Sequence, residues 1–272
     1  MRYLFALCIL LVALPCTLPA QDTTYTNSIG MKFVLIRPGS MIVGRFQPTV
    51  PPPGGGLGGG PGLADSVYKK AQQMAKEAFM PGFYVAIRQP FYLGQFEVTQ
   101  AQWKKVMGNN PSYFQGNKVT DDAGNHPAEN ITWEDAQAFI KKLNALEKGK
   151  AVYRLPTEFE WEYAARAGAA DDISWGKIFA SAVIAERHTH AAGEKKPNDW
   201  GLYDMLGNVW EWVQDFYNEK IFADPTPPEK GKVHVLKGSS FTGDVKNATY
   251  MTHAGGPADG WNVGFRVLME MK

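Results

Sequence analysis

The chain has 272 residues, with 28 Lys and Arg residues against 27 Asp and Glu residues and a formal net charge of +1. This length fits one large domain or two small ones. A nearly neutral chain gives no reason to expect a nucleic-acid partner, which would need an excess of cations on one surface.

The first twenty residues are typical of a secretory signal peptide. Arg2 supplies the positive start, residues 4–14 form an apolar run, and Leu18-Pro19-Ala20 offers a small-residue cleavage site. We therefore expect export to the periplasm or the extracellular space after cleavage near Ala20. The apolar run is short for a membrane span and no later stretch is long enough, so no transmembrane segment is expected.

Both cysteines, Cys8 and Cys16, lie inside this expected signal peptide. The mature chain would then carry no thiol, and could form neither a disulfide nor a thiolate metal site nor a cysteine nucleophile.

The segment after the signal peptide shows three successive patterns. Residues 28–44 alternate apolar and polar side chains around a Pro38-Gly39 turn signal, which predicts a β-hairpin. Residues 48–62, PTVPPPGGGLGGGPG, have too little apolar content to join a core and are interpreted as a linker or exposed loop. Residues 64–80 predict a short amphipathic helix. We expect an insertion at about 46–88 that contains the last two.

Three capping boxes predict helices farther along the chain. In each, a threonine hydroxyl accepts from an orphan amide, and the residue three positions later reaches back. The pairs are Thr99 with Gln102, Thr132 with Asp135, and Thr157 with Glu160. The predicted helices end at Gly108, at about Glu147 and at Gly168. Short strands and long loops fill the rest, so the fold class is α+β rather than a βαβ array.

Residues 200–212, WGLYDMLGNVWEW, predict a metal site. Two carboxylates and two main-chain carbonyls at offsets 0, 3, 5 and 7 can face one point and supply hard oxygen ligands for calcium. The four positions are Asp204, Gly207, Val209 and Glu211. The alternative is a buried strand with two core tryptophans and Glu211 on the surface.

A second, weaker metal pattern is Glu186, His188 and His190. Alternation along a strand would place all three on one face and offer imidazole and carboxylate ligands. A polar loop with partly exposed histidines is the favoured alternative, because no further ligand can be identified in the sequence.

Aromatic and amide side chains near the C-terminus could line a ligand groove. Apolar walls with a few polar groups suit a peptide or a small ligand such as a sugar. The candidates are Trp210, Ser240, Phe241, Asn247, Trp261 and Asn262. Core packing is the alternative for Trp210, whereas Trp261 lies in a Gly-rich loop and is the best candidate for an exposed anchor. No catalytic residue is assigned, since no G-x-S-x-G elbow is present.

Several blocks together resemble one family, that of the formylglycine-generating enzymes or sulfatase-modifying factors. The blocks are residues 27–44, FEVTQAQW at 96–103, HPAENITWEDAQAF at 126–139, YRLPTEFEWEYAARAG at 153–168, GLYDMLGNVWEW at 201–212 and NVGFRV at 262–267. The resemblance implies a single compact domain over 27–272, a variant of the C-type lectin fold. It also implies structural calcium at the four positions Asp204, Gly207, Val209 and Glu211.

The chain departs from the family at the reaction centre. Formylglycine-generating members carry two copper-binding cysteines after a Gly-Gly-Ser; here the segment reads Gly238-Ser239-Ser240, and Gly243 and Ala248 stand at the cysteine positions. Neither residue offers Cu(I) a thiolate, so copper is not expected. We therefore expect an exported, calcium-stabilised family member that recognises a peptide or other ligand, possessing no formylglycine-generating activity. The alternative is a divergent oxidoreductase or peptide-modifying enzyme with another metal in the same cleft, through His188 and His190, so enzymatic activity stays open.

Overall fold

The computed structural model describes residues 23–46, 69–70, 73–74, 80–170, 172–222, 225–256 and 260–272. The expected signal peptide, the linker at 48–62 and most of the helix predicted at 64–80 lie outside these residues. None of the helices in the described part of the chain combines the length and the apolar content of a membrane span.

The largest sheet is five-stranded, in the order β1-β2-β5-β11-β6, and its neighbouring strands are antiparallel. Its strands are β1 (Thr24–Thr26), β2 (Lys32–Ile36), β5 (Phe91–Gly94), β6 (Ala151–Arg154) and β11 (Leu268–Met271). The last strand of the chain, β11, therefore lies between β5 and β6, which ties the C-terminal block into the interior of the sheet.

A second sheet of four strands, in the order β10-β7-β8-β9, carries the segments of functional interest. Its strands are β7 (Trp210–Phe216), β8 (His234–Lys237), β9 (His253–Gly255) and β10 (Val263–Gly264). The helices are α2 (Gln100–Met107), α3 (Trp133–Leu146), α4 (Glu158–Arg166) and α5 (Trp175–Ser181), with short 3₁₀ turns η1 (Gly116–Lys118), η2 (Ala123–Asn125) and η3 (Val245–Asn247). This mixture of short strands, few helices and long loops confirms the α+β fold class.

The β-hairpin predicted at 28–44 is wrong. Strand β2 does not pair with β3 (Gly39–Phe46); β2 pairs with β5, and β3 pairs with β4 (Met80–Ile87) in a separate two-stranded sheet. Residues 32–46 thus run against 80–94 as one long bent ribbon, and residues 80–87 of the expected insertion form half of it. Gly39 begins β3 after the bend, and a side chain would not fit there, because a Cβ would overlap the hydroxyl oxygen of Tyr163 on α4.

The three capping boxes are confirmed. Thr99, Thr132 and Thr157 each accept a backbone hydrogen bond from the residue three positions later, whose side chain reaches back in turn. Helix α2 ends at Gly108 with φ 86°, α3 ends at Glu147, and α4 is followed by left-handed Ala167 and Gly168. These boundaries follow from local chemistry, since each cap involves residues only three apart.

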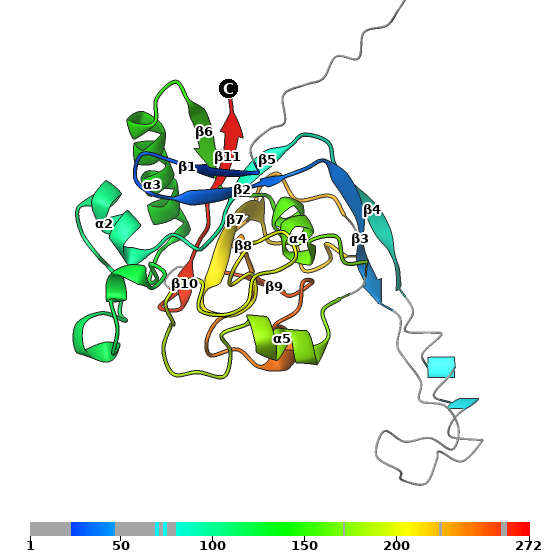
Figure 1. Cartoon of the computed structure of the whole chain (residues 1–272). Helices are drawn as coiled ribbons and strands as arrows, with labels where there is room; N and C mark the ends of the chain where they lie inside the picture. Colours follow the sequence, from blue (N-terminus) through cyan, green and yellow to red (C-terminus); the bar gives the residue numbers. More distant parts are fainter. Residues whose placement is uncertain are drawn as a thin grey trace, which may run out of the picture.

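Two large apolar clusters lie on either side of the central strands, and a third, smaller one contains Phe114 and Phe241. One large cluster packs α2 and α3 together through stacked Trp103 and Phe139, whose ring centroids are 5.4 Å apart. The other large cluster surrounds fully buried Trp161 on α4 and includes inward residues of β3. Figure 1 shows α2 and α3 at one side of the domain and the β3–β4 ribbon at the opposite side, with β7 and β8 between them.

Candidate functional site

The segment that leads into β7 is a tight turn of unusual backbone conformation. Asp204, Gly207 and Asn208 have φ of 52°, 84° and 55°. Gly207 is required by space as well as by φ, because a Cβ there would overlap the carbonyl oxygen of Val183. The turn places Asp204 and, at the start of β7, Glu211 in the protein interior, where both are almost completely buried.

Glu211 is held by donors from two distant elements. Its Oε2 accepts from the indole Nε1 of Trp161 at 2.7 Å and from Nε of Arg266 at 2.6 Å, and its Oε1 accepts from Nη2 of Arg266 at 2.6 Å. The alternative in which Glu211 lies on the surface is therefore excluded. Glu211 instead belongs to a buried polar cluster.

Two further carboxylates complete this cluster. Glu97 accepts from the backbone amide of Val209 at 3.0 Å and from the side-chain amide of Asn208 at 2.8 Å. Asp204 accepts from the amide of Gly193 through Oδ2 at 2.6 Å, while its buried Oδ1 has no hydrogen-bond partner among the described residues. We name Glu97, Asp204, Glu211 and Arg266 the carboxylate cluster.

The carboxylate cluster holds three acids and one guanidinium, all buried. Burial, followed by the charges of Asp204 and Glu211, raises the pKa of Glu97 well above its ordinary value. Burial also raises the pKa of Asp204 to about 6. Both shifts have the same main origin, because burial removes the water that would stabilise the charged carboxylate, and neighbouring carboxylates add to the rise.

Two features of the carboxylate cluster are compatible with a divalent cation: its excess of acidic groups and one buried oxygen without a partner. Oδ1 of Asp204 is a buried acceptor with no partner among the described residues, and the three carboxyl groups of the cluster outnumber its single guanidinium. Both Glu211 oxygens already bind Arg266, although a carboxylate oxygen can accept more than one contact. No group of three His, Cys, Asp or Glu in the described chain converges on one point, so an ion here would need main-chain carbonyls as well, such as those predicted for Gly207 and Val209.

The positions aligned with the family's copper cysteines are closed. A Cβ on Gly243 would overlap the Ser239 hydroxyl and lie 2.9 Å from the carbonyl oxygen of Ser240. Ala248 is completely buried and belongs to the apolar cluster around Trp161. A side chain larger than the native one would have to displace neighbours at either position.

Beside this segment lies an aromatic surface, which we name the Trp261 surface. Its exposed members are Trp261 and Tyr113, which are 49% and 52% exposed. Both contact the ring of Phe114, at centroid distances of 6.2 and 5.1 Å. Trp261 also meets buried Phe241 edge-on at 5.3 Å. Two exposed aromatic side chains on a rigid aromatic base form a candidate contact surface.

Polar groups lie at the edge of the Trp261 surface. The side-chain amide of Asn262 donates to the hydroxyl of Ser240 at 2.9 Å, and this hydroxyl is 3.1 Å from that of Thr242. Three of the predicted groove residues, Ser240, Trp261 and Asn262, are therefore brought together, but Ser240 is buried and supports Asn262 from beneath. Thr242, Tyr113 and Phe114 were not predicted, because they lie in irregular segments without periodicity.

The other predicted groove residues do not line this surface. Phe241 is completely buried and forms its base. Trp210 is half-buried and packs against the cluster of α2 and α3, as its core-packing alternative predicts. Asn247 is exposed on η3, which packs beside α5.

A buried acid lies beneath the Trp261 surface. Glu129 has no accessible surface; its Oε1 accepts from the amide of Phe114 at 2.8 Å, and its Oε2 has no hydrogen-bond partner among the described residues. Burial raises the pKa of Glu129 to about 7. The acid therefore changes charge near neutral pH directly below an aromatic contact surface.

The second metal pattern is not assembled. Residues 186–190 form an irregular loop, not a strand, so the premise of side-chain alternation fails. The ring of His190 pairs with Glu194 at 3.0 Å, and the ring of His188 contacts the carbonyl of Thr189 at 2.9 Å. Throughout the described ranges, no three acidic, histidine or cysteine side chains are placed to bind a metal, and Glu186 remains exposed.

Comparison with known proteins places these features in context. The profile of the sulfatase-modifying factor enzyme 1-like domain matches residues 31–271. A protein of Paenibacillus barcinonensis named chaperone protein LppX is 30% identical over 213 residues, which cover 58% of this chain and 71% of that protein. The formylglycine-generating enzyme of Streptomyces coelicolor is 37% identical over 141 residues, which cover 43% of this chain and 42% of the enzyme.

A structural comparison agrees at the level of the fold. PvdO from Pseudomonas aeruginosa superposes with a TM-score of 0.69 at 22% identity, covering 93% of this chain and 100% of that structure. The aligned part of this chain spans less than half of the Streptomyces enzyme, so activity does not follow from the match.

Proposed function

This chain belongs to the family of sulfatase-modifying factor enzyme 1-like domains, and we propose that it is a recognition module of that family, without formylglycine-generating activity. The observation that carries the proposal is the closed reaction centre. Gly243 has no room for a cysteine side chain without displacing Ser239, and Ala248 is enclosed in the core. A pair of thiolates able to bind Cu(I) is absent from the sequence at these positions.

The Trp261 surface is the proposed contact site. Exposed indole and phenol rings provide large contact areas at low entropic cost, and the exposed hydroxyl of Thr242 with the partly exposed amide of Asn262 provides hydrogen bonds. This combination suits an extended peptide, whose backbone offers amides and whose side chains offer apolar groups. The name of the Paenibacillus relative, a chaperone protein, supports a polypeptide as the ligand.

Calcium is the proposed structural ion. Its positive charge would favour the ionised form of the three carboxyl groups, which outnumber the single guanidinium of Arg266, and the unpartnered Oδ1 of Asp204 would bind the ion. Asp204, Gly207, Val209 and Glu211 would hold the ion. Its role would be to stabilise the turn that precedes β7. Export follows from the signal peptide expected at residues 1–20, and N-terminal sequencing of the secreted chain tests it.

The loss of activity is tested by co-expression with a sulfatase peptide that carries the target cysteine. We expect mass spectrometry to find no aldehyde, while the Streptomyces coelicolor enzyme, expressed in parallel, converts the same peptide. Aldehyde formed by this chain would refute the proposal. Elemental analysis of the purified protein should find calcium; about one equivalent of iron or copper would favour the oxidoreductase alternative instead.

A further inference from the structure

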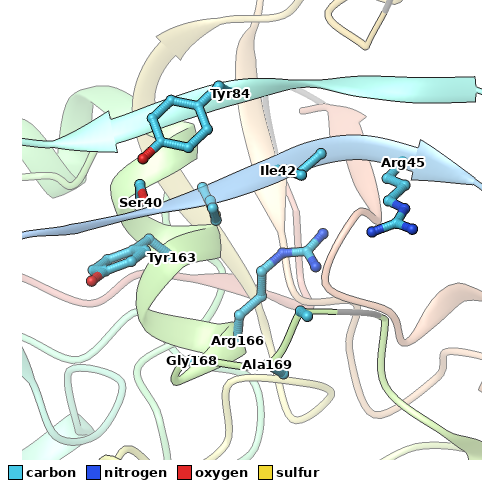
Figure 2. Close-up of a pocket in the computed structure, with 10 residues that line it drawn as sticks. Ser40, Ile42, Arg45, Tyr84, Tyr163, Arg166, Gly168 and Ala169 are labelled. Atoms are coloured by element: carbon cyan, nitrogen blue, oxygen red, sulfur yellow. The ribbon is translucent and has the colours of Figure 1, made fainter.

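A pocket of about 280 Å³ lies between strand β3 and the carboxyl end of helix α4. Figure 2 shows Ser40, Ile42 and Arg45 on β3 at one side of it, and Tyr163 and Arg166 on α4 at the other. Strand β3 has a single neighbour, β4, so its other edge is not covered by a strand of the described sheet. None of the residues of the Trp261 surface or the carboxylate cluster lines this pocket.

Two arginines line the pocket, and they differ in how they are held. Arg166 is 5% exposed; its Nε and Nη2 donate to Oε1 of Glu162 at 2.9 and 2.7 Å, which fixes the guanidinium. Arg45 is exposed and forms no ion pair with a described residue. Figure 2 shows its guanidinium directed from β3 toward the side of the pocket where Arg166 lies. A guanidinium fixed by an ion pair and an exposed, unpaired one thus line the same cavity.

The carboxylate that binds Arg166 does not neutralise the pocket. Glu162 is shared with the buried ammonium of Lys237 at 3.2 Å, and Lys237 is also 3.8 Å from Glu158. Arg166 and Lys237 therefore balance Glu162 and Glu158, and Arg45, which has no ion-pair partner among the described residues, adds a positive charge to the pocket. Among the described residues that line the pocket there is no Asp or Glu. An anion would gain two guanidinium contacts there without meeting an acidic side chain.

The walls of the pocket are apolar and aromatic. Tyr84 is 71% exposed and stands opposite Ile42, itself partly exposed, in the β3–β4 ladder. Tyr163 donates from its hydroxyl to the carbonyl of Arg37 at 3.3 Å, so its ring is held in place. An uncovered tyrosine beside an arginine is a typical contact for an aromatic group.

We propose that this pocket binds a small aryl or similarly flat organic anion, with its oxyanion between Arg45 and Arg166 and its apolar body against Tyr84 and Ile42. The volume is near the lower end of ligand pockets, which fits a molecule of one ring. A carboxylate, a phosphate ester and a sulfate ester share the chemistry that two guanidinium groups recognise. This site is separate from the peptide surface and does not depend on it.

The test is calorimetric titration of the full chain with benzoate, phenyl phosphate and phenyl sulfate at low ionic strength. We expect at least one of these to bind, and which one binds identifies the head group. Arg45→Gln should weaken binding about tenfold or more, because a charge-assisted contact is lost. Arg88→Gln removes an equally exposed charge outside the pocket and should change binding less than about twofold. Tyr84→Ala should weaken binding of phenyl phosphate and phenyl sulfate, but it should leave binding of inorganic phosphate and sulfate unchanged.

Three results would overturn the proposal. These are equal binding of uncharged benzyl alcohol, equal effects of Arg45→Gln and Arg88→Gln, and no binding of any of the three anions up to about 10 mM. Since Arg45 is exposed and unpaired, its variant is expected to fold, and circular dichroism checks this. Trp261→Ala should bind the anion as the wild type does, so failure of the peptide proposal and failure of the anion proposal can be told apart.

Discussion

Glu211 and Arg266 form a bidentate ion pair with essentially no exposure to solvent, through N–O distances of 2.6 Å at both oxygens. Arg266 also donates to the carbonyl of Gly94 on β5 at 3.1 Å, so the pair connects the four-stranded sheet to the five-stranded one. A residue predicted as a metal ligand is thus also the partner of an internal cation. This changes what its removal should do.

Glu211→Ala should lower the free energy of unfolding by about 3–5 kcal/mol, because Arg266 would remain buried and unpaired. This loss of unfolding free energy should be present with excess chelator as well as with added calcium, because the unpaired Arg266 remains buried in both conditions. Urea titration measures the loss. Glu270→Ala is the matched control, since Glu270 is half-exposed and pairs with Arg154 on the surface; its loss should stay below about 1 kcal/mol. Equal losses for the two variants would contradict the central role of the buried pair.

Calcium dependence is better tested at Asp204, whose Oδ1 has no partner. The melting temperature of the wild type should rise when calcium is added, since an ion bound only by the folded state stabilises it, by about 2.7 kcal/mol at a hundredfold excess over Kd. Asp204→Asn keeps the size and tolerates the left-handed φ of 52° but loses the charge, and should abolish most of the rise. Exposed Asp199→Asn should retain it. If the melting temperature of the wild type does not change when calcium is added, the proposal of a structural calcium ion is wrong.

Trp261→Ala should separate binding from stability. Because Trp261 is half-exposed, its removal should cost less than about 1 kcal/mol of unfolding free energy. Phe241→Ala, directly beneath, should cost about 3–5 kcal/mol. A peptide selected from a random library against the wild type should bind Trp261→Ala at least about tenfold more weakly.

Tyr84→Ala serves as the control for that binding experiment, since it removes an exposed aromatic ring in a different pocket. It should leave the affinity for the peptide unchanged. If melting shows that Trp261→Ala is as damaging as Phe241→Ala, the indole belongs to the core and the proposed contact surface is wrong.

Glu129 should make stability depend on pH. Its pKa is raised to about 7 in the folded protein by burial, above its ordinary value of 4.5. The folded state therefore holds a proton that the unfolded state has released, and stability falls as the pH rises from about 4.5 to 7. The shift corresponds to at most about 3 kcal/mol.

Glu129→Gln removes this titration and should flatten the dependence. Between pH 5 and pH 8, the unfolding free energy of the variant should fall less than that of the wild type. Urea titration at both pH values measures this difference. Glu134→Gln, on the surface-facing first turn of α3, is the control and should leave the wild-type slope unchanged. A Glu129→Gln variant that keeps the full wild-type slope would show that other groups cause it.

Features that depend on near neighbours in the chain could be predicted from the sequence. Thr99, Thr132 and Thr157 start helices because each cap is complete within four residues. The turn of Asp204 and Gly207 was not predicted as a turn; only the spacing of its carboxylates and carbonyls could be taken from the residue order. The pairing of β2 and β3 could not, since an alternating pattern specifies a buried face but not the strand beside it.

The candidate site likewise has features that the sequence determined and features that only the tertiary structure decided. Sequence alone determined the family blocks, the missing cysteines at Gly243 and Ala248, and the local carboxylate spacing. Only the tertiary structure decided that Glu97 and Arg266 join Glu211, that Phe114 supports Trp261, and that Arg45 and Arg166 share a pocket. Charges and aromatic rings interact through space over a few ångströms, and residues that lie so close can be separated by more than a hundred positions along the chain.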